Sequence, residues 1–206
     1  MLQLRTIHPN TLGILKQIMA LPIFAAHFLV GGTSLALQMG HRVSIDLDLF
    51  THTPFDSTTL LQTLEEHFQV QPLTVTDTIF IAVVNGVKVD CVFFRYQFAF
   101  PIIETEGVRI ADTRDIAPMK LDAVTKRGSK KDFIDMYYLF MLYPPTEILQ
   151  WYENMFRHST SMHVIRSLTY FEDAEKEPPL NMIREADWNE VKRIFQAEAK
   201  KVILSS

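Results

Sequence analysis

"LVGGTSLALQMGHRVSIDLDLF", residues 29–50, is the segment from which the rest of the architecture can be predicted. It joins a pair of glycines to two aspartates that stand one residue apart in an otherwise apolar run. An ionised carboxylate in apolar surroundings is destabilising unless a cation or hydrogen bonds compensate its charge. We therefore expect cations or hydrogen-bond donors, from the chain or from a ligand, next to Asp46 and Asp48.

The alternation in "VSIDLDLF" (43–50) predicts a β-strand. The isoleucine and the leucines would share one face, and Ser44, Asp46 and Asp48 would share the other. Residues two apart on a strand are separated by about 6.5–7 Å, with side chains on the same side. Both aspartates can then reach one site in front of the sheet.

Upstream of these aspartates, "HFLV" (27–30) predicts a short buried strand, and Gly31-Gly32 predicts a tight turn. Thr33 can cap a short helix, "SLALQM", that ends at Gly40. The N–H groups of the turn, with Thr33 or Ser34 at the helix N-terminus, would form a phosphate cradle. A plain turn without a ligand is the alternative. The spacing matches neither the dinucleotide-binding nor the Walker pattern.

A third carboxylate lies in "TIFIAVVNGVKVDCVFF" (78–94), which predicts a hairpin with Asn85-Gly86 as its turn. Asp90 is out of phase with its apolar neighbours. If its strand lies beside residues 43–50, three carboxylates converge and repel one another unless cations join them. Oxygen ligands suit Mg²⁺ or Mn²⁺, and two such ions can clamp a phosphoryl group in transfer. A solvated strand edge is the alternative.

The segment "KLDAVTKRGSKKD" (120–132) is rich in cations. Lys120 and Arg127 are two helical turns apart on one face, where they could contact a triphosphate. A solvated helix C-terminus is the alternative. Ser129 and Asp132 have the spacing of a capping box. Asp135 lies one turn further, and we expect it to form an ion pair with Lys120 or Arg127.

The remaining pattern predicts a fold of the α+β class, in which a mixed β-sheet flanked by helices precedes a helical C-terminal part. We place an α/β core at residues 1–112 and a helical region at 113–206. A short strand is expected near 108–110. Helices are expected at 10–20, 57–68, 115–127, 130–142, 146–157, 161–174 and 187–203.

Composition narrows the class of protein. The chain has 206 residues, 48% of them hydrophobic, and a net charge of −4, which does not favour nucleic-acid binding by the whole surface. A single cysteine, Cys91, allows no internal disulfide and fits a reducing cytosol. Neither a signal peptide nor a membrane span is expected, so we predict a cytoplasmic protein. We expect the aromatic residues at 93, 94, 96, 98 and 100 to belong to the core rather than to a base-stacking surface.

Two motifs carry a resemblance to a known family. "GGTSLALQMGHRVSIDLDLF" resembles the first motif of the nucleotidyltransferase superfamily that includes DNA polymerase beta, and especially of the AbiEii/AbiGii abortive-infection toxins. "DIAPMKLDAVTKRGSKKDFIDMYYL" (115–139) is similar to that family's later motifs. The resemblance covers roughly residues 28–140 and implies a nucleotidyltransferase-like fold. In that family the toxin of a toxin–antitoxin pair transfers nucleotides, for some members to the 3′ end of tRNA.

The resemblance also implies roles for residues of this chain. Asp46 and Asp48 would be metal ligands, and Ser44 would lie at the triphosphate. Lys120 would contact nucleotide phosphate, and Asp135 would be the carboxylate of the last motif. Asp90 is our own candidate for the third acidic position.

The leading hypothesis is an enzyme that transfers a nucleoside monophosphate from NTP to an acceptor hydroxyl and releases pyrophosphate. The acceptor would be RNA, and an antitoxin protein would be a partner. Two Mg²⁺ or Mn²⁺ ions would be held by Asp46, Asp48 and Asp90, which with Lys120 form the catalytic set. The predicted nucleotide-binding residues are Gly31, Gly32, Thr33, Ser34, Ser44, Arg127 and Asp135. Alternatives are a catalytically silent nucleotide- or partner-binding protein of the same fold and a metal-dependent phosphodiesterase.

Overall fold

The computed structural model describes residues 1–157 and 161–205, which divide into two compact units, Met1–Asp112 and Thr113–Ser206. The first unit contains the β-sheet, and the second is helical. The predicted α+β class is therefore confirmed. Within the described ranges, no helix combines the length and the apolar character needed to cross a membrane.

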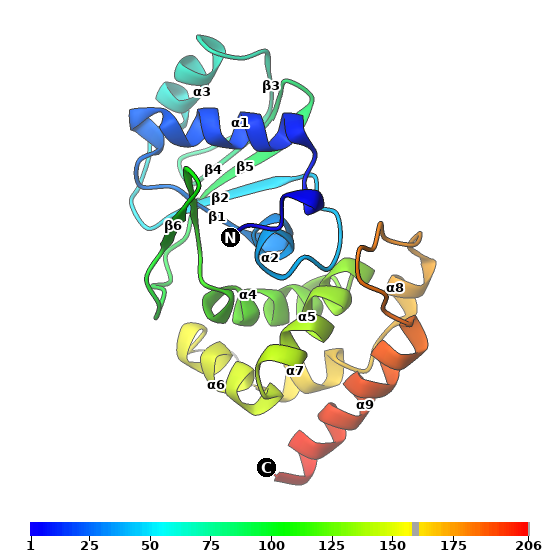
Figure 1. Ribbon diagram of the computed structural model, residues 1–206. Coiled ribbons are helices and arrows are strands. Elements are labelled where there is room, and N and C mark those ends of the chain that lie inside the picture. The colour runs from blue at the N-terminus through cyan, green and yellow to red at the C-terminus, as the bar shows by residue number, and fades with distance from the viewer. Residues whose placement is uncertain (158–160, 206) are drawn as a thin grey trace. The chain divides into compact units, whose positions relative to one another are not determined.

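The sheet of the first unit has seven strands among the described residues, in the order β3-β4-β5-β2-β1-β7-β6 (Figure 1). It is mixed, because β1 is antiparallel to β2, whereas β2 is parallel to β5 and β1 to β7. The strands are β1 Phe28–Val30, β2 Leu47–Thr51, β3 Val70–Val75, β4 Ile79–Val84, β5 Val87–Phe93, β6 Ile103–Thr105 and β7 Val108–Ile110. The helices of this unit are η1 Leu4–Thr6, α1 Pro9–Ala20, η2 Pro22–Phe24, α2 Gly31–Met39 and α3 Ser57–Glu65.

The two faces of the sheet differ in burial. Leu47 and Leu49 of β2 are fully buried, whereas Asp48 and Phe50, which alternate with them, are only half-buried. The buried face packs against apolar side chains of α1 and α3, which lie on that side of the sheet (Figure 1). Full burial of one such leucine contributes about 1.5–3 kcal/mol, so this packing fixes which face each strand residue occupies. The other face of β2 and β5 carries polar groups and is only partly buried, and we call it the open face.

The hairpin predicted from Asn85-Gly86 is present and joins β4 to β5. Both turn residues have positive φ angles, 46° at Asn85 and 83° at Gly86, as a two-residue type I′ turn requires. The Asn85 side chain also accepts a hydrogen bond of 2.8 Å from the backbone N–H of Gln69. The turn sets the pairing of β4 with β5 and hence the position of Asp90.

Strand β2 is shorter than predicted. It begins at Leu47 rather than near Val43, and Ile45, expected on the buried face, is 63% exposed. The preceding segment is instead held from another direction, because the N–H of Ser44 donates to the carbonyl of Thr6 at 2.9 Å. Asp46 therefore precedes the strand, so the predicted extent of the strand is wrong, and the convergence of Asp46 with Asp48 on one site stays a prediction.

Helix α2 also begins earlier than predicted. Gly31 and Gly32 are its first two residues rather than a turn before it, and Val30 rather than Thr33 occupies the N-cap position. The predicted end at Gly40 is confirmed. Gly40 has a φ of 70° and its N–H donates to the carbonyl of Ala36, as in a left-handed C-terminal cap.

In the second unit, α4 contacts α5, α6 and α7. The rings of Phe133, Phe171 and Phe195 meet at 5.0 and 5.1 Å around Phe133 and form an aromatic core. The predicted helix at 130–142 agrees with α5, whereas the one predicted at 161–174 is divided into α7 and α8. The helices are α4 Thr113–Lys126, α5 Lys130–Leu142, α6 Pro145–Met155, α7 Ser161–Ser167, α8 Glu172–Lys176 and α9 Trp188–Ser205.

Candidate functional site

Two of the three predicted carboxylates are neighbours in the sheet. Parallel pairing of β2 with β5 places Asp48 opposite Asp90. The pairs on either side, Leu47 with Val89 and Leu49 with Cys91, are fully buried. Asp48 and Asp90 therefore share the open face on strands about 4.8 Å apart. The expectation that the strand of Asp90 lies beside that of Asp48 is confirmed.

A lysine balances the charge of Asp90. The Nζ of Lys88 donates to both carboxylate oxygens of Asp90, at 2.7 and 2.6 Å. Lys88 precedes Asp90 by two residues on the same strand, so both side chains lie on the open face. The lysine side chain is 43% exposed. Such a pair contributes only about 0–1 kcal/mol, so a competing cation could replace the lysine at modest cost.

Asp48 lies against the first residue of α2. Gly31 has a φ of 69°, and a Cβ atom at that position would be 2.1 Å from Oδ2 of Asp48. Only glycine allows both this backbone conformation and this approach. The carboxylate consequently lies at the N-terminus of a helix, where the helix dipole stabilises negative charge.

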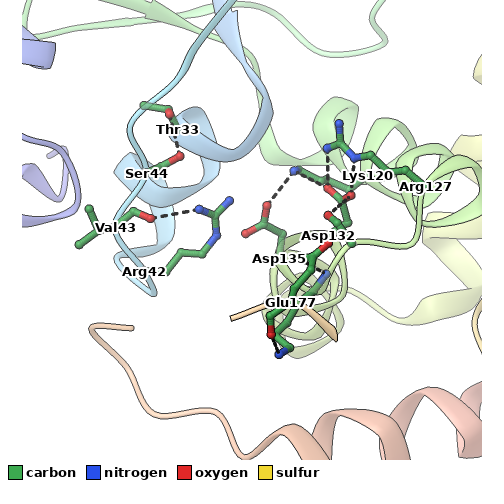
Figure 2. A network of polar contacts seen from close by, with 11 residues as sticks. Thr33, Arg42, Val43, Ser44, Lys120, Arg127, Asp132, Asp135 and Glu177 are labelled. Atoms are coloured by element: carbon green, nitrogen blue, oxygen red, sulfur yellow. Dashed lines mark hydrogen bonds and ion pairs between the residues drawn. The ribbon is translucent and has the colours of Figure 1, made fainter. Parts of the chain in front are cut away.

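The first turn of α2 is linked to the segment that precedes β2. The Oγ1 of Thr33 is hydrogen-bonded to the Oγ of Ser44 at 2.8 Å (Figure 2). The same hydroxyl also donates to the backbone carbonyl of Asp46. Ser34 faces the interior, because it is fully buried and its Oγ accepts a hydrogen bond from Gln38 at 3.1 Å. Thr33 and Ser44 are thus brought together, and Ser34 is the least accessible of the predicted phosphate-binding hydroxyls.

Arg42 is a further residue of this site, in the segment between α2 and β2. Its side chain is buried, and Nη1 donates to the carbonyl of Val43 at 3.1 Å (Figure 2). Nη2 lies 2.3 Å from the position that a Cβ on Gly32 would occupy. Arg42 therefore brings a positive charge to the N-terminus of α2, where Asp48 brings a negative one.

In the second unit, Lys120 is buried between two aspartates. Its Nζ lies 2.8 Å from Oδ2 of Asp135 and 3.1 Å from Oδ1 of Asp132 (Figure 2). The expected ion pair of Asp135 with Lys120 is confirmed. Arg127 adds two hydrogen bonds to Asp132, from Nε at 2.7 Å and from Nη2 at 2.9 Å. The network joins α4 and the residue after it to α5.

Asp132 is the centre of this network. Burial alone would raise the pKa of Asp132, but the hydrogen bonds from Arg127 and the charges of Lys120 and Arg127 lower that pKa to about 2. The hydroxyl of Ser129 also donates to the Asp132 carboxylate, at 2.7 Å. The predicted capping box is therefore wrong, because Ser129 makes no side-chain hydrogen bond to the backbone of α5.

The donor chemistry of the first unit suits a hard divalent cation. Carboxylate oxygens are preferred ligands of Mg²⁺ and Mn²⁺, and Asp48 and Asp90 lie side by side. Within residues 1–157 and 161–205, however, no three His, Cys, Asp or Glu side chains are gathered as a ready set of ligands. The paired carboxylates fit the ion, and the three-carboxylate set stays a prediction.

The aromatic residues at the end of β5 and after it are not buried in the core. Phe93, Phe94, Phe98 and Phe100 are half-buried, and Tyr96 is 37% exposed. The prediction that they belong to the core is therefore wrong. The alternation of the strand ends at Phe93, so the following residues are not forced onto its buried side.

Solved structures share this arrangement of sheet and helices. JHP933 from Helicobacter pylori aligns with a TM-score of 0.61 and 18% identity over 95% of this chain and 93% of that one. MenT4, a nucleotidyltransferase toxin from Mycobacterium tuberculosis H37Rv, aligns with a TM-score of 0.60 and 14% identity over 90% and 82% of the two chains. The fold is that of the nucleotidyltransferases, as the first motif predicted.

Sequence comparison then defines the family. Residues 13–111 match the family described as "Nucleotidyl transferase AbiEii toxin, Type IV TA system". An uncharacterized protein from Aquifex aeolicus (strain VF5) is 32% identical over 199 residues, which cover 92% of this chain and 94% of that relative. The chain belongs to the AbiEii family of nucleotidyltransferase toxins, and it is a nucleotidyltransferase. The predicted family is confirmed.

Proposed function

We propose that this protein transfers a nucleoside monophosphate from NTP to a hydroxyl of RNA, with the 3′ end of tRNA as the first candidate acceptor. Pyrophosphate is released, and the protein acts as the toxin of a pair whose antitoxin restrains it. The observation that carries the proposal is the pairing of Asp48 with Asp90 on the open face, with Asp48 against the N-terminus of α2.

The N-terminus of α2 holds the triphosphate. The first N–H groups of a helix have no partner within it, and the helix dipole favours an anion at that end. Arg42 adds a positive charge beside Gly32, and Ser44 adds a hydroxyl. These groups bind and orient the phosphates so that the α-phosphorus comes to Asp48.

Asp46, Asp48 and Asp90 would hold two divalent ions, Mg²⁺ or Mn²⁺. When bound, such ions supply Lewis-acid stabilisation of charge on the phosphoryl oxygens. The exposed Lys88 would then leave Asp90, which accepts the proton of the attacking hydroxyl. Without the ions, Lys88 keeps the paired carboxylates from repelling each other.

The resemblance of residues 115–139 to the family's later motifs supports roles for Lys120, Arg127 and Asp135. Lys120 and Arg127 are the proposed phosphate contacts, and Asp135 is the group that fixes the ammonium of Lys120 at 2.8 Å. The net charge of −4 makes RNA binding by the whole surface unfavourable. RNA would therefore have to be bound by local groups of lysine and arginine side chains that contact its phosphates.

The test supplies the purified protein with each NTP labelled at the α-phosphate, total RNA, and Mg²⁺ or Mn²⁺. We expect label to appear on RNA, and to fall by about 100-fold or more in Asp48→Asn, because a charge that stabilises the transition state is lost. Asp77→Asn is the matched control, since Asp77 is exposed in the turn between β3 and β4.

Three results would contradict the proposal. Label that reaches protein or a small molecule, but not RNA, would exclude the RNA acceptor. Release of labelled RNA fragments without extension would indicate a phosphodiesterase. Full activity in the presence of a strong chelator would exclude the divalent ions.

A further inference from the structure

A half-exposed aromatic cluster lies on the same sheet face as the paired aspartates. Asp48 is followed two residues later by Phe50 on β2, and Asp90 is followed by Val92 and then Phe94 beyond the end of β5. Because strand side chains alternate, Phe50 and Val92 share the open face with the aspartates. Phe94 lies beside them, because its ring contacts that of Phe50. Phe50 is therefore about 7 Å along the strand from Asp48.

Phe94 is the centre of this cluster. Its ring lies 5.3 Å from Phe50, 5.3 Å from Tyr96 and 5.7 Å from Phe98, measured between ring centroids. His52 fixes the chain here, because its Nδ1 lies 3.0 Å from the carbonyl of Phe94. We call Phe50, Phe94, Tyr96 and Phe98 the aromatic platform. Each ring is incompletely buried, which is unusual for so many neighbouring aromatic side chains.

The platform and the phosphate cradle lie on opposite sides of Asp48. The pairing of β1 with β2 puts Val30 opposite Asp48 and Phe28 opposite Phe50. Helix α2 begins directly after Val30, so the cradle lies at the Asp48 end of this ladder. The platform lies at the other end, where Phe28 contacts Phe98 at 5.2 Å.

The order of cradle, Asp48 and platform along the sheet is the order that in-line phosphoryl transfer requires. The attacking and leaving oxygens stand on opposite sides of the phosphorus in the transition state. If the pyrophosphate leaves toward α2, the attacking hydroxyl arrives from the side of the platform. This inference rests on the proposed function.

We propose that the aromatic platform stacks an unpaired base at the end of the acceptor RNA strand and so delivers its hydroxyl to Asp48 and Asp90. Aromatic rings bind the faces of unpaired bases with little sequence preference. Arg95, exposed between Phe94 and Tyr96, offers a cation for the adjoining phosphate. The acceptor is therefore a single-stranded end rather than a duplex.

The first experiment measures binding without catalysis, so that it can succeed even if transfer fails. A fluorescent single-stranded oligoribonucleotide is titrated with wild-type protein in the absence of NTP. Phe94→Leu removes the aromatic face but keeps apolar volume, and we expect it to raise Kd by about 5- to 100-fold. Phe94→Tyr restores a ring and should restore binding.

Two comparisons show that the effect is stacking. The same oligonucleotide with abasic residues at its 3′ end should bind the wild-type protein as weakly as the intact oligonucleotide binds Phe94→Leu. Phe94→Leu should not weaken the binding of the abasic oligonucleotide any further. Phe68→Leu is the control protein, because Phe68 is half-buried against the core but lies beyond α3, away from β2. It should bind like wild type.

The second experiment measures nucleotide transfer, and Phe94→Leu should raise the KM for RNA while leaving the KM for NTP within about twofold. A raised KM for NTP alone would mean that the rings hold the incoming nucleotide and would overturn the proposal. Unchanged RNA binding in Phe94→Leu would also overturn it and would leave a protein partner as the occupant. An absence of transfer, with base-dependent binding intact, would contradict the proposed function but not the platform.

Discussion

Gly31 shows at the scale of one residue how the site depends on a missing side chain. The backbone there is left-handed, and the carboxylate of Asp48 occupies the space where a Cβ would stand. Gly31 is therefore required both by its backbone conformation and by the lack of space for a Cβ atom. Gly107 separates these two effects, because it has a similar φ of 79° but no atom within 4 Å of the position of a Cβ.

We predict that Gly31→Ala lowers the free energy of unfolding more than Gly107→Ala. The left-handed backbone should cost each variant about 1–2 kcal/mol. Only Gly31→Ala must also displace the Asp48 carboxylate, which should add about 1–3 kcal/mol and abolish nucleotide transfer. Urea unfolding and transfer assays check this. Equal destabilisation of the two variants, with activity retained, would show that Asp48 can move aside freely.

For single residues, the sequence predicted which side chains belong to the site better than it predicted where those side chains lie. Asp48 and Asp90 were recognisable because a charge out of phase with buried neighbours needs a reason to be there. The burial of Ser34 and the position of Arg42 could not be predicted from the sequence. Both depend on the contact between α2 and the segment before β2, whose residues are distant in sequence. A cation three residues after the end of a short helix was the available signal for Arg42.

Among the elements, α4 and α5 are joined by the charges around Asp132. The carboxylate is buried and accepts hydrogen bonds from three side chains, two of them cationic. A buried carboxylate is stable only while these donors remain. Its pKa of about 2 means that the folded state favours the ionised form.

We predict that Asp132→Asn destabilises the second unit by about 3 kcal/mol at pH 7, the low end for a broken buried ion pair, because Lys120 keeps Asp135. Asp122→Asn is the control. Its partner, Lys126, is 72% exposed, so the change should be within about 0.5 kcal/mol. Chemical denaturation monitored by fluorescence of Trp151 and Trp188 measures both variants. A similar small effect for the two would contradict the buried network.

Elements with strong local signals were predictable. The Asn85-Gly86 hairpin and α5 follow from turn chemistry and helical periodicity, which depend on nearby residues. Strand β3 was missed, because it is an exposed edge strand that contains Pro72 and lacks alternating burial. The start of β2 was wrong, because the hydrogen bond from Ser44 to Thr6 overrides an alternating pattern that continues upstream.

On the scale of the whole molecule, the two units respond to acid in different ranges of pH. His27 of the first unit is buried, and neither ring nitrogen has a hydrogen-bond partner within the described residues. Burial, and then the positive charge of Arg109, lower the pKa of His27 to about 4. The unfolded chain, with an ordinary histidine pKa near 6.5, therefore binds more protons than the folded chain between pH 6.5 and 4.

We predict that the first unit loses about 3 kcal/mol of stability as the pH falls from 6.5 to 4, because the unfolded state gains protons that the folded state resists. The second unit should lose the contribution of Asp132, about 2.5 kcal/mol, only as the pH falls from about 4 to 2. His27→Phe should remove the first loss, since a phenyl ring suits the contacts with Phe24 and Phe55. His67→Gln, at an exposed site, should leave it unchanged.

The two ranges can be measured separately. Both tryptophans belong to the second unit, so their fluorescence reports that unit, whereas circular dichroism reports both. Acid titration should change the dichroism before the fluorescence. Coincident transitions in wild type, or no effect of His27→Phe, would contradict this order.

The alternation of β5 has a consequence for how this chain can vary over evolution. Val89 and Cys91 hold Asp90 on the open face because they themselves fill the buried one. One residue inserted or deleted between the hairpin turn and Asp90 would reverse this phase and turn the carboxylate toward α1 and α3. Related chains should therefore tolerate changes of length in the loop before α3, but should keep a constant spacing from Asn85-Gly86 to the acidic position.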